Sequence, residues 1–312
     1  MQIEGLSASN MVKIISPAKV NLVLAVGEKR EDGFHSVDTI MHALALHDTL
    51  SMRRLSDEGS GEGLHIVLKC ETSFTIDPLD VTAEENIAYR AVKELAAELG
   101  RNEDETIEMV LNKVIPAQAG LGGGSSNAAA ALLGAATLWG VDPASEQVLA
   151  VAARLGADVT FFLHGGCTRL SGKGEVFEAS LATRKGFVLL VRPDAGVSTA
   201  KAYAEFDANP QLPSAEYLAT LAGYTEASQV EPWNNLTQAA CAVEPQVAEV
   251  VEWAKGQAGV TGSLVCGSGS AVCLICDSYE AATEASVDAH KHEWWCRVTS
   301  FSPLGAAIVE NV

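Results

Sequence analysis

Four glycines and two serines stand between a proline and an uncharged, alanine-rich run in IPAQAGLGGGSSNAAAALLGAATLWG, residues 115–140. Glycine allows positive φ and close backbone approach to a ligand, and Ser125 and Ser126 add hydroxyl donors. If a helix begins here, its first N–H groups are unpaired and its dipole adds partial positive charge. The chemistry that this pattern favours is the binding of phosphate groups.

The elements on either side must hold the loop in place. TIEMVLNKVIP, residues 106–116, is typical of a strand, and residues 128–141 are typical of a buried helix that ends near Gly140. This apolar run is shorter than the ~20 residues of a membrane span, so we expect it to be buried in protein. A close-packed turn or a flexible linker is the alternative, but a linker would not join a strand to a buried helix.

Two common nucleotide-binding patterns do not fit this loop. A P-loop needs a lysine after its last glycine, and no lysine lies between Lys113 and Lys173. A dinucleotide fingerprint counted from Gly120 and Gly122 needs a third glycine where Ser125 stands. The loop therefore indicates a phosphate site of another kind.

A strand near the N-terminus has one apolar face and one polar face. In KVNLVLAV, alternation places Val20, Leu22, Leu24 and Val26 on one face and Lys19 with Asn21 on the other. Because the apolar face is predicted to be core, the charge of Lys19 must lie in a cleft or at the surface. An ordinary polar strand residue is the alternative for Asn21.

The remaining chain is predicted to alternate strands and helices. We expect a loose tail at residues 1–10 and a solvated loop at 57–63, strands within 38–55, 64–70 and 187–193, and helices within 83–100, 144–156, 214–223 and 246–256. A locally polar stretch at residues 183–186 predicts a boundary between domains 1–183 and 184–312.

Charge and cysteine content narrow the class of partner. The chain has 21 basic and 40 acidic residues, a net charge of -19 that disfavours nucleic acid and anionic membranes as partners. Seven scattered cysteines and an N-terminus without a leader pattern predict a reduced, cytoplasmic protein.

Neither of two possible metal or redox motifs is convincing. Cys273 and Cys276 have CxxC spacing but lie in an apolar run that reads as a strand, where their side chains point to opposite faces. Core packing is the favoured interpretation over redox or metal chemistry. HKHEWWC, residues 290–296, has irregular spacing and no second cluster to complete a metal site.

PAQAGLGGGSSNAAAAL resembles the phosphate-binding motif of the GHMP kinase superfamily, and GLGGGSSNAA is similar to its form in the 4-diphosphocytidyl-2-C-methyl-D-erythritol kinases. Further segments resemble that family in the same order, namely SPAKVNLVLAVGEKREDGFHSVDTIMHAL, ENIAYRAV, GADVTFFLHGG and VCGSGSAVCLI. The match is weaker over residues 187–257. The resemblance implies an α+β, two-domain fold, with the active site in a cleft between an N-terminal ATP-binding domain and a C-terminal domain.

The same resemblance implies a reaction and its catalytic residues. ATP would phosphorylate the 2-hydroxyl of a cytidine diphosphate-linked methylerythritol, with Asp158 as base and Lys19 beside it. A helix N-cap is the alternative for Asp158, and an extended surface side chain is the alternative for Lys19. A GHMP kinase with another acceptor, such as homoserine or mevalonate, is the competing enzyme. A catalytically silent sensor of this fold should lack the lysine or the aspartate.

The resemblance also implies binding residues. Asn21 would contact the acceptor, Phe34 and His35 would hold its cytosine, and Pro193 would line the same pocket. Phe34 stands where tyrosine is common, and a core phenylalanine beside a solvated histidine is the alternative. Residues expected to bind ATP are Pro116, Gly120, Gly122, Gly123, Gly124, Ser125, Ser126 and Asn86, of which Asn86 could instead cap a helix. ATP implies Mg²⁺, for which Ser126 is a candidate ligand.

Overall fold

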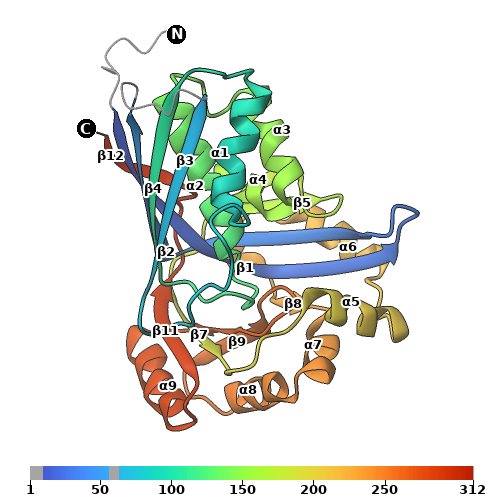
Figure 1. Ribbon diagram of the computed structural model, residues 1–312. Helices are drawn as coiled ribbons and strands as arrows, with labels where there is room; N and C mark the ends of the chain where they lie inside the picture. Colours follow the sequence, from blue (N-terminus) through green and yellow to red (C-terminus); the bar gives the residue numbers. More distant parts are fainter. Residues whose placement is uncertain (1–9, 56–62, 312) are drawn as a thin grey trace.

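The computed structural model describes residues 10–55 and 63–311 (Figure 1). The expected N-terminal tail and the expected loop at 57–63 lie almost wholly outside these residues. Within them, no helix is both long enough and apolar enough to cross a membrane.

An eight-stranded sheet organises the first half of the chain. Its strands are β1 (Met11–Lys29), β2 (His35–Leu55), β3 (Leu64–Thr72), β4 (Glu105–Lys113), β5 (Cys167–Ser171), β6 (Val176–Leu181), β8 (Trp233–Asn234) and β12 (Ala307–Asn311). The main path runs β12-β1-β2-β4-β3, with β5 on β2, β6 on β5 and β8 on β1. The long β1–β2 hairpin extends beyond the helices and passes between the two halves of the molecule (Figure 1).

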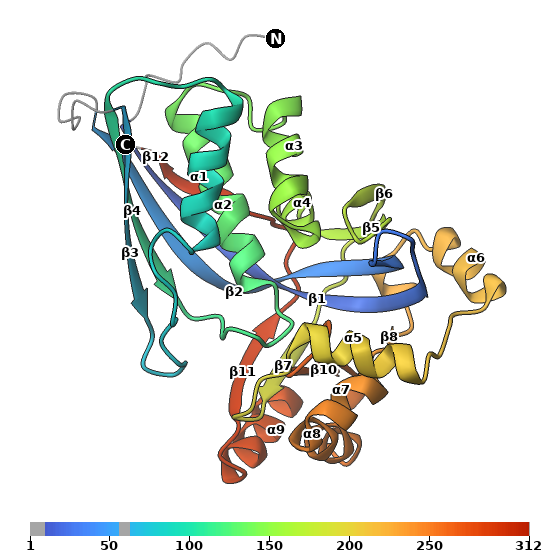
Figure 2. The same ribbon diagram turned by 45° about the vertical axis from the view of Figure 1, so that its right-hand side comes forward.

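Four helices cover one face of this sheet (Figure 2): α1 (Ile87–Glu98), α2 (Gly123–Leu138), α3 (Glu146–Leu155) and α4 (Ala157–His164). The uncharged helix expected after the glycine loop is α2, and it lies in the centre of the layer, against α1, α4 and β1. Helix α1 buries Ala88, Ala91, Val92 and Leu95, which recur at helical spacing. The expected helices and strands in this half are confirmed, although α1 begins only at Ile87 and α2 begins earlier than expected, at Gly123.

A four-stranded antiparallel sheet organises the second half, in the order β11-β7-β10-β9. Its strands are β7 (Phe187–Arg192), β9 (Val260–Val265), β10 (Val272–Cys276) and β11 (Trp295–Ser300). The helical segments are α5 (Thr199–Ala208), α6 (Ala215–Gly223), η1 (Ala227–Gln229), α7 (Thr237–Val243), α8 (Pro245–Lys255) and α9 (Tyr279–Lys291). Helices α8 and α9 cover the sheet, and α5 lies beside the β1–β2 hairpin (Figure 2).

The cysteines behave as core residues. Cys273 and Cys276 lie on β10 and are buried in different apolar clusters, so the expectation of a strand with opposite faces is confirmed. All seven cysteines are free thiols. Across residues 10–55 and 63–311, no three His, Cys, Asp or Glu side chains converge in a way that would hold a metal ion.

The chain crosses between the two sheets more than once. We propose a domain boundary within residues 183–186, since β7 opens the second sheet immediately afterwards. Strands β8 and β12 follow this boundary in sequence but pair with β1 of the first sheet. With the boundary placed there, the proposed C-terminal domain gives two strands to the N-terminal sheet.

The predicted faces of β1 need a correction. A register shift between Asn21 and Val23 exchanges the two faces of the strand. Val20 and Leu22 pack in the cluster between the sheets, whereas Leu24 and Val26 pack with helix α5 and α7 residues on the other side. Simple alternation was wrong for Leu24 and Val26, because a β-bulge interrupts the two-residue period.

Candidate active site

Two cavities lie on either side of the glycine loop. We call the first the loop cavity, about 410 Å³, which Asn86, Pro116, Gly124 and Ser125 help to line. The second is the hairpin cavity, about 300 Å³, which lies against β1, β2 and α5. Gly120 and Gly122 line both cavities, so the loop is the wall that they share.

The backbone of this wall depends on glycine at two positions. Gly120 has φ of 73° and Gly122 has φ of 72°, both in the left-handed region. A Cβ on Gly120 would clash with the carbonyl oxygen of Cys266, where the second glycine turn packs against the loop. The expectation of positive φ therefore holds for Gly120 and Gly122. It was wrong for Gly123 and Gly124, which begin helix α2.

The start of α2 opens onto the loop cavity. Gly122 is its N-cap residue, and no side chain caps the first turn. The first N–H groups of a helix have no intrahelical partners, so they are available to an anion. Gly123, Gly124 and Ser125 line the cavity.

Ser126 does not face this cavity. Its side chain is fully buried, and its hydroxyl accepts a hydrogen bond of 2.8 Å from Ser16 Oγ. Its backbone N–H donates to Gly122 O. The roles of Ser126 in ATP and magnesium binding stay predictions, and its buried hydroxyl gives them no support.

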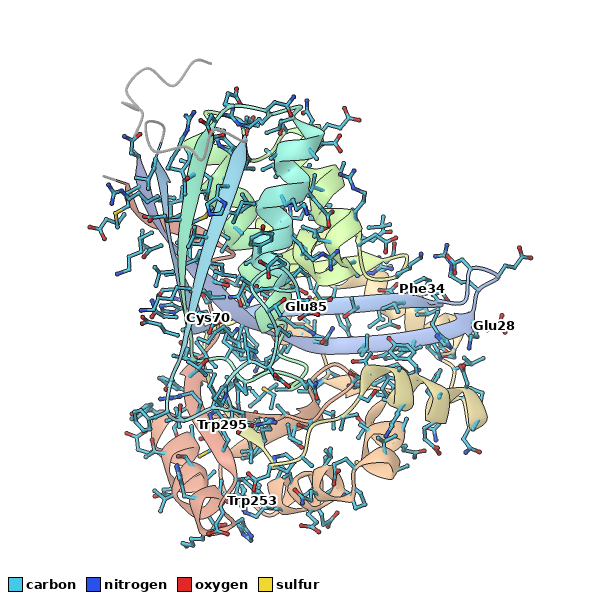
Figure 3. All side chains as sticks on the ribbon, in the orientation of Figure 1. Glu28, Phe34, Cys70, Glu85, Trp253 and Trp295 are labelled. Atoms are coloured by element: carbon cyan, nitrogen blue, oxygen red, sulfur yellow. The ribbon has the colours of Figure 1, made fainter. Side chains whose placement is uncertain are left out.

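Asn86 lies where it can both cap helix α1 and face the loop cavity. It is the N-cap of α1, where its Oδ1 accepts from Ala88 N at 2.9 Å, which confirms the cap. It also lines the loop cavity, next to Glu85 (Figure 3), so contact with ATP stays a prediction. Pro116 lines the same cavity.

Lys19 and Asp158 meet at the hairpin cavity. Lys19 Nζ lies 3.3 Å from Asp158 Oδ2, and their side chains are 4% and 29% exposed. Asp158 is the second residue of α4, whose N-cap is Gly156, so the N-cap alternative was wrong. The surface alternative for Lys19 was wrong too, since this lysine is buried.

Asn21 and Thr39 hold Lys19 in place. Lys19 Nζ donates to Asn21 Oδ1 at 2.6 Å, and Asn21 Nδ2 donates to Thr39 Oγ1 at 2.9 Å. Thr39 in turn donates to Val23 O at 2.6 Å. Lys19 N also donates to Leu121 O, which ties β1 to the glycine loop. All three polar side chains line the hairpin cavity.

Phe34 and His35 have different surroundings. Phe34 is 57% exposed near the end of the hairpin (Figure 3), and Lys173 Nζ lies 4.0 Å above its ring centre. His35 is buried, with Nε2 2.6 Å from Asp207 Oδ1, and it packs against Tyr203. The alternative of a core phenylalanine beside a solvated histidine was wrong, because the exposures are reversed. Neither residue is among those that line the hairpin cavity.

Pro193 does not lie where it was expected. It is buried just after β7, outside the residues that line the two cavities. Its place in the base pocket stays a prediction that the two cavities do not support.

Sequence reasoning missed Tyr203 and Lys173, which both line the hairpin cavity. Burial, with the nearby negative charge of Asp158, raises the pKa of Tyr203 to about 12, so its hydroxyl stays protonated and can donate. Lys173 stands between two glycines in SGKGE, a visible turn motif, but its direction cannot be read from the turn. Both reach the site from segments more than 100 residues after the hairpin.

The site and fold have known counterparts. A family model of the GHMP kinases N terminal domain matches residues 86–166, and one of the GHMP kinases C terminal matches residues 225–292. The chain is a GHMP kinase, a small-molecule phosphotransferase that uses ATP, and the expected α+β fold is confirmed.

Individual relatives show which family of GHMP kinases the chain belongs to. A 4-diphosphocytidyl-2-C-methyl-D-erythritol kinase from Mycolicibacterium gilvum is 36% identical over 89% of this chain and 85% of its own length. The chain belongs to the family of 4-diphosphocytidyl-2-C-methyl-D-erythritol kinases. A crystal structure of such an enzyme superposes with a TM-score of 0.71 at 30% identity, covering 93% of this chain and 99% of that one. A homoserine kinase from Cytophaga hutchinsonii, with a TM-score of 0.72 at 17% identity, covers 99% of this chain and 100% of its own, and shows the fold alone.

Proposed function

We propose that this protein transfers the γ-phosphate of ATP to the 2-hydroxyl of 4-diphosphocytidyl-2-C-methyl-D-erythritol, a step in non-mevalonate isoprenoid synthesis. ATP occupies the loop cavity and the acceptor occupies the hairpin cavity. The observation that carries this assignment is the wall that they share, where Gly120 and Gly122 allow backbone to approach ligands from both sides. An anion bound at the start of α2 would then lie next to Lys19 and Asp158.

The Lys19 and Asp158 pair supports proton transfer during the reaction. Asp158 Oδ2 takes the proton of the acceptor hydroxyl, and the oxygen so released attacks the γ-phosphorus as its bond to the β-phosphate oxygen breaks. Lys19 stabilises the developing negative charge, since Asn21 keeps its ammonium on the cavity side of β1. ADP leaves with the bridging oxygen.

The part of the hairpin cavity that Tyr203 and Lys173 line, with Phe34 just outside it beside Lys173, suits a base joined to a diphosphate. Phe34 offers an exposed aromatic face and Tyr203 an aromatic hydroxyl donor. His35, held by Asp207, packs against Tyr203 and fixes its position. Lys173 supplies a cation for the diphosphate, which the strongly negative protein would otherwise repel.

Magnesium fits the donors near the shared wall. Mg²⁺ takes oxygen ligands, usually one or two carboxylates with substrate phosphates and water. The Ser125 hydroxyl, which lines the loop cavity, is the protein group that would hold it, with the ATP phosphates and water supplying the other oxygens. When bound, the ion would neutralise charge on the phosphates.

We also place the protein in the cytoplasm, on the evidence of its scattered cysteine pattern.

An acceptor panel tests this proposal. The protein is incubated with ATP, Mg²⁺ and one of 4-diphosphocytidyl-2-C-methyl-D-erythritol, homoserine or mevalonate, and products are identified by mass spectrometry. We expect one added phosphate on the cytidine compound alone. Phosphorylation of homoserine or mevalonate in its place would reject the acceptor and keep only the kinase class.

A further inference from the structure

A cluster of polar side chains lies beneath the first turn of α2. Asp48, Ser16 and Ser126 are fully buried, and Asn127 and Lys113 are 2% and 3% exposed. They come from β1, β2, the end of β4 and α2, and we call them the Asp48 cluster. A buried charge is costly unless it is paired and hydrogen-bonded, so the contacts of Asp48 decide what this cluster does.

Four donors satisfy the Asp48 carboxylate. Oδ1 accepts from Val114 N at 2.7 Å and from Ile115 N at 2.9 Å. Oδ2 accepts from Asn127 Nδ2 at 2.9 Å and from Lys113 Nζ. The two backbone bonds fix the corner where β4 ends and the glycine loop begins. One carboxylate therefore joins strand β2, the loop and helix α2.

Lys113 occupies an electrostatically unfavourable place. A Cβ on Gly123 would lie 3.2 Å from Lys113 Nζ, so the ammonium lies beside the positive end of α2. Asp48 offsets this repulsion, with a second bond of 2.9 Å from Lys113 Nζ to Asn127 Oδ1. The Lys113 ammonium has three N–H donors. Among the described residues, its bonds to Asp48 and Asn127 use two of them. Lys113 and Asn127 line the loop cavity, but Asp48 does not.

We infer that Asp48 is a positioning residue for nucleotide phosphate binding. It keeps the Lys113 ammonium at the wall of the loop cavity and fixes the first corner of the loop, and it acts only through these groups. The inference rests on the proposed function, because it takes the loop cavity as the ATP site. If Asp48 only neutralised Lys113 for stability, removing both charges together would restore normal nucleotide binding.

The experiment compares nucleotides with and without phosphate. Dissociation constants for ATP, ADP and adenosine are measured by calorimetry for the wild type, Asp48→Asn, and Asp48→Asn with Lys113→Met. We expect both variants to bind ATP and ADP roughly tenfold or more weakly, the scale of one charge-assisted hydrogen bond, and to bind adenosine almost normally. The double variant should regain stability in urea, since no buried charge is left unpaired, but not phosphate affinity.

A matched control comes from the same strand. Asp38 of β2 pairs with Arg169 at 2.9 and 2.5 Å, away from the loop cavity, and Asp38→Asn should leave all three constants unchanged. If both Asp48 variants keep the wild-type ratio of ATP to adenosine affinity, or if the double variant regains it, the inference is overturned and the proposed function stands. A wild-type protein that fails to bind ATP overturns both.

Discussion

At the scale of single residues, the groups proposed for the reaction differ in how firmly their neighbours position them. Lys19 is buried and bonded to Asn21, and Asp158 is partly exposed at the cavity. The Phe34 side chain is largely exposed, with Lys173 Nζ over its ring. The charges of the reaction are thus held firmly, whereas the group proposed for base binding stays open to its ligand.

Replacing Phe34 by alanine tests the base pocket. Because Phe34 is 57% exposed, Phe34→Ala should scarcely change the free energy of unfolding. It should weaken binding of the cytidine acceptor by about 1 to 3 kcal/mol, the range for stacking of a base on an aromatic ring. Calorimetry with acceptor and with ATP measures both affinities, and Phe34→Tyr serves as the tolerated control. Equal losses for the two ligands would show that Phe34 does not select the base.

At the scale of elements, the strand, glycine loop and helix around residues 105–138 form the proposed ATP site. Gly122 ends the loop and caps α2, with a Cβ position 2.8 Å from Phe162 Cζ and 3.0 Å from Lys19 Cγ. The same residue therefore affects the loop, the helix start and the packing beside Lys19, the proposed catalytic lysine.

Gly122→Ala should weaken ATP binding and turnover together. The left-handed φ of 72° costs a non-glycine residue roughly 1 to 2 kcal/mol, and the added carbon pushes on Lys19 and Phe162. Gly140→Ala is the matched control, since Gly140 has φ of 69° and open space around it. Steady-state kinetics and urea unfolding separate the effects. Equal KM values for ATP in Gly122→Ala and Gly140→Ala would mean that the loop does not shape the proposed ATP site.

The local elements were largely predictable from the sequence, because their signals are local. The glycine loop between a strand and an uncharged helix, and the shared face of Lys19 and Asn21, follow from backbone geometry and a two-residue period. The bulge after Asn21 left no sequence signal, so Leu24 and Val26 were placed on the wrong face. Successive side chains on a helix point about 100° apart. Ser125 therefore faces the loop cavity, whereas the adjacent Ser126 is buried beneath the helix.

The contacts between distant segments were not predictable in the same way. Tyr203 and Lys173 meet the hairpin only after the chain has folded around it, and nothing near either residue indicates the partner. The resemblance supplied Phe34 and His35 but not their opposite exposures, which depend on Asp207 and Tyr203 of helix α5. The return of β12 to the first sheet is likewise a tertiary feature.

At the scale of the whole molecule, buried His42 lies where the two halves join. His42 Nδ1 donates to Ala43 O at 2.9 Å, and Nε2 accepts from Arg184 N at 3.2 Å, as a neutral ring requires. Phe301, from the segment that returns to the first sheet, packs against His42 and beneath the Arg184 guanidinium. Burial, with the nearby Arg184 charge, lowers the pKa of His42 to about 4.

This lowered pKa predicts a pH dependence of stability. In the unfolded chain, the pKa of this histidine is near 6.5. The contribution of neutral, buried His42 to the free energy of unfolding is therefore complete above pH 6.5 and is lost as the pH falls toward 4. The loss should approach about 3 kcal/mol, and it should be missing in His42→Gln. Urea unfolding at pH 7.5 and 4.5 gives the difference for each protein. Parallel pH profiles for the two proteins would remove His42 from the explanation.

The most direct test of the central claim is the turnover of Asp158→Asn. Asparagine preserves size but cannot take the acceptor proton, so kcat should fall about 10²- to 10⁴-fold while both substrate affinities stay within a few-fold. Lys19→Met should lose activity in a similar way, and the double variant should lose much less than the product of the two single losses. The measurement is steady-state kcat with calorimetric affinities for ATP and acceptor. A folded Asp158→Asn protein that turns over within a few-fold of the wild type would contradict the account, because the proton must then go elsewhere.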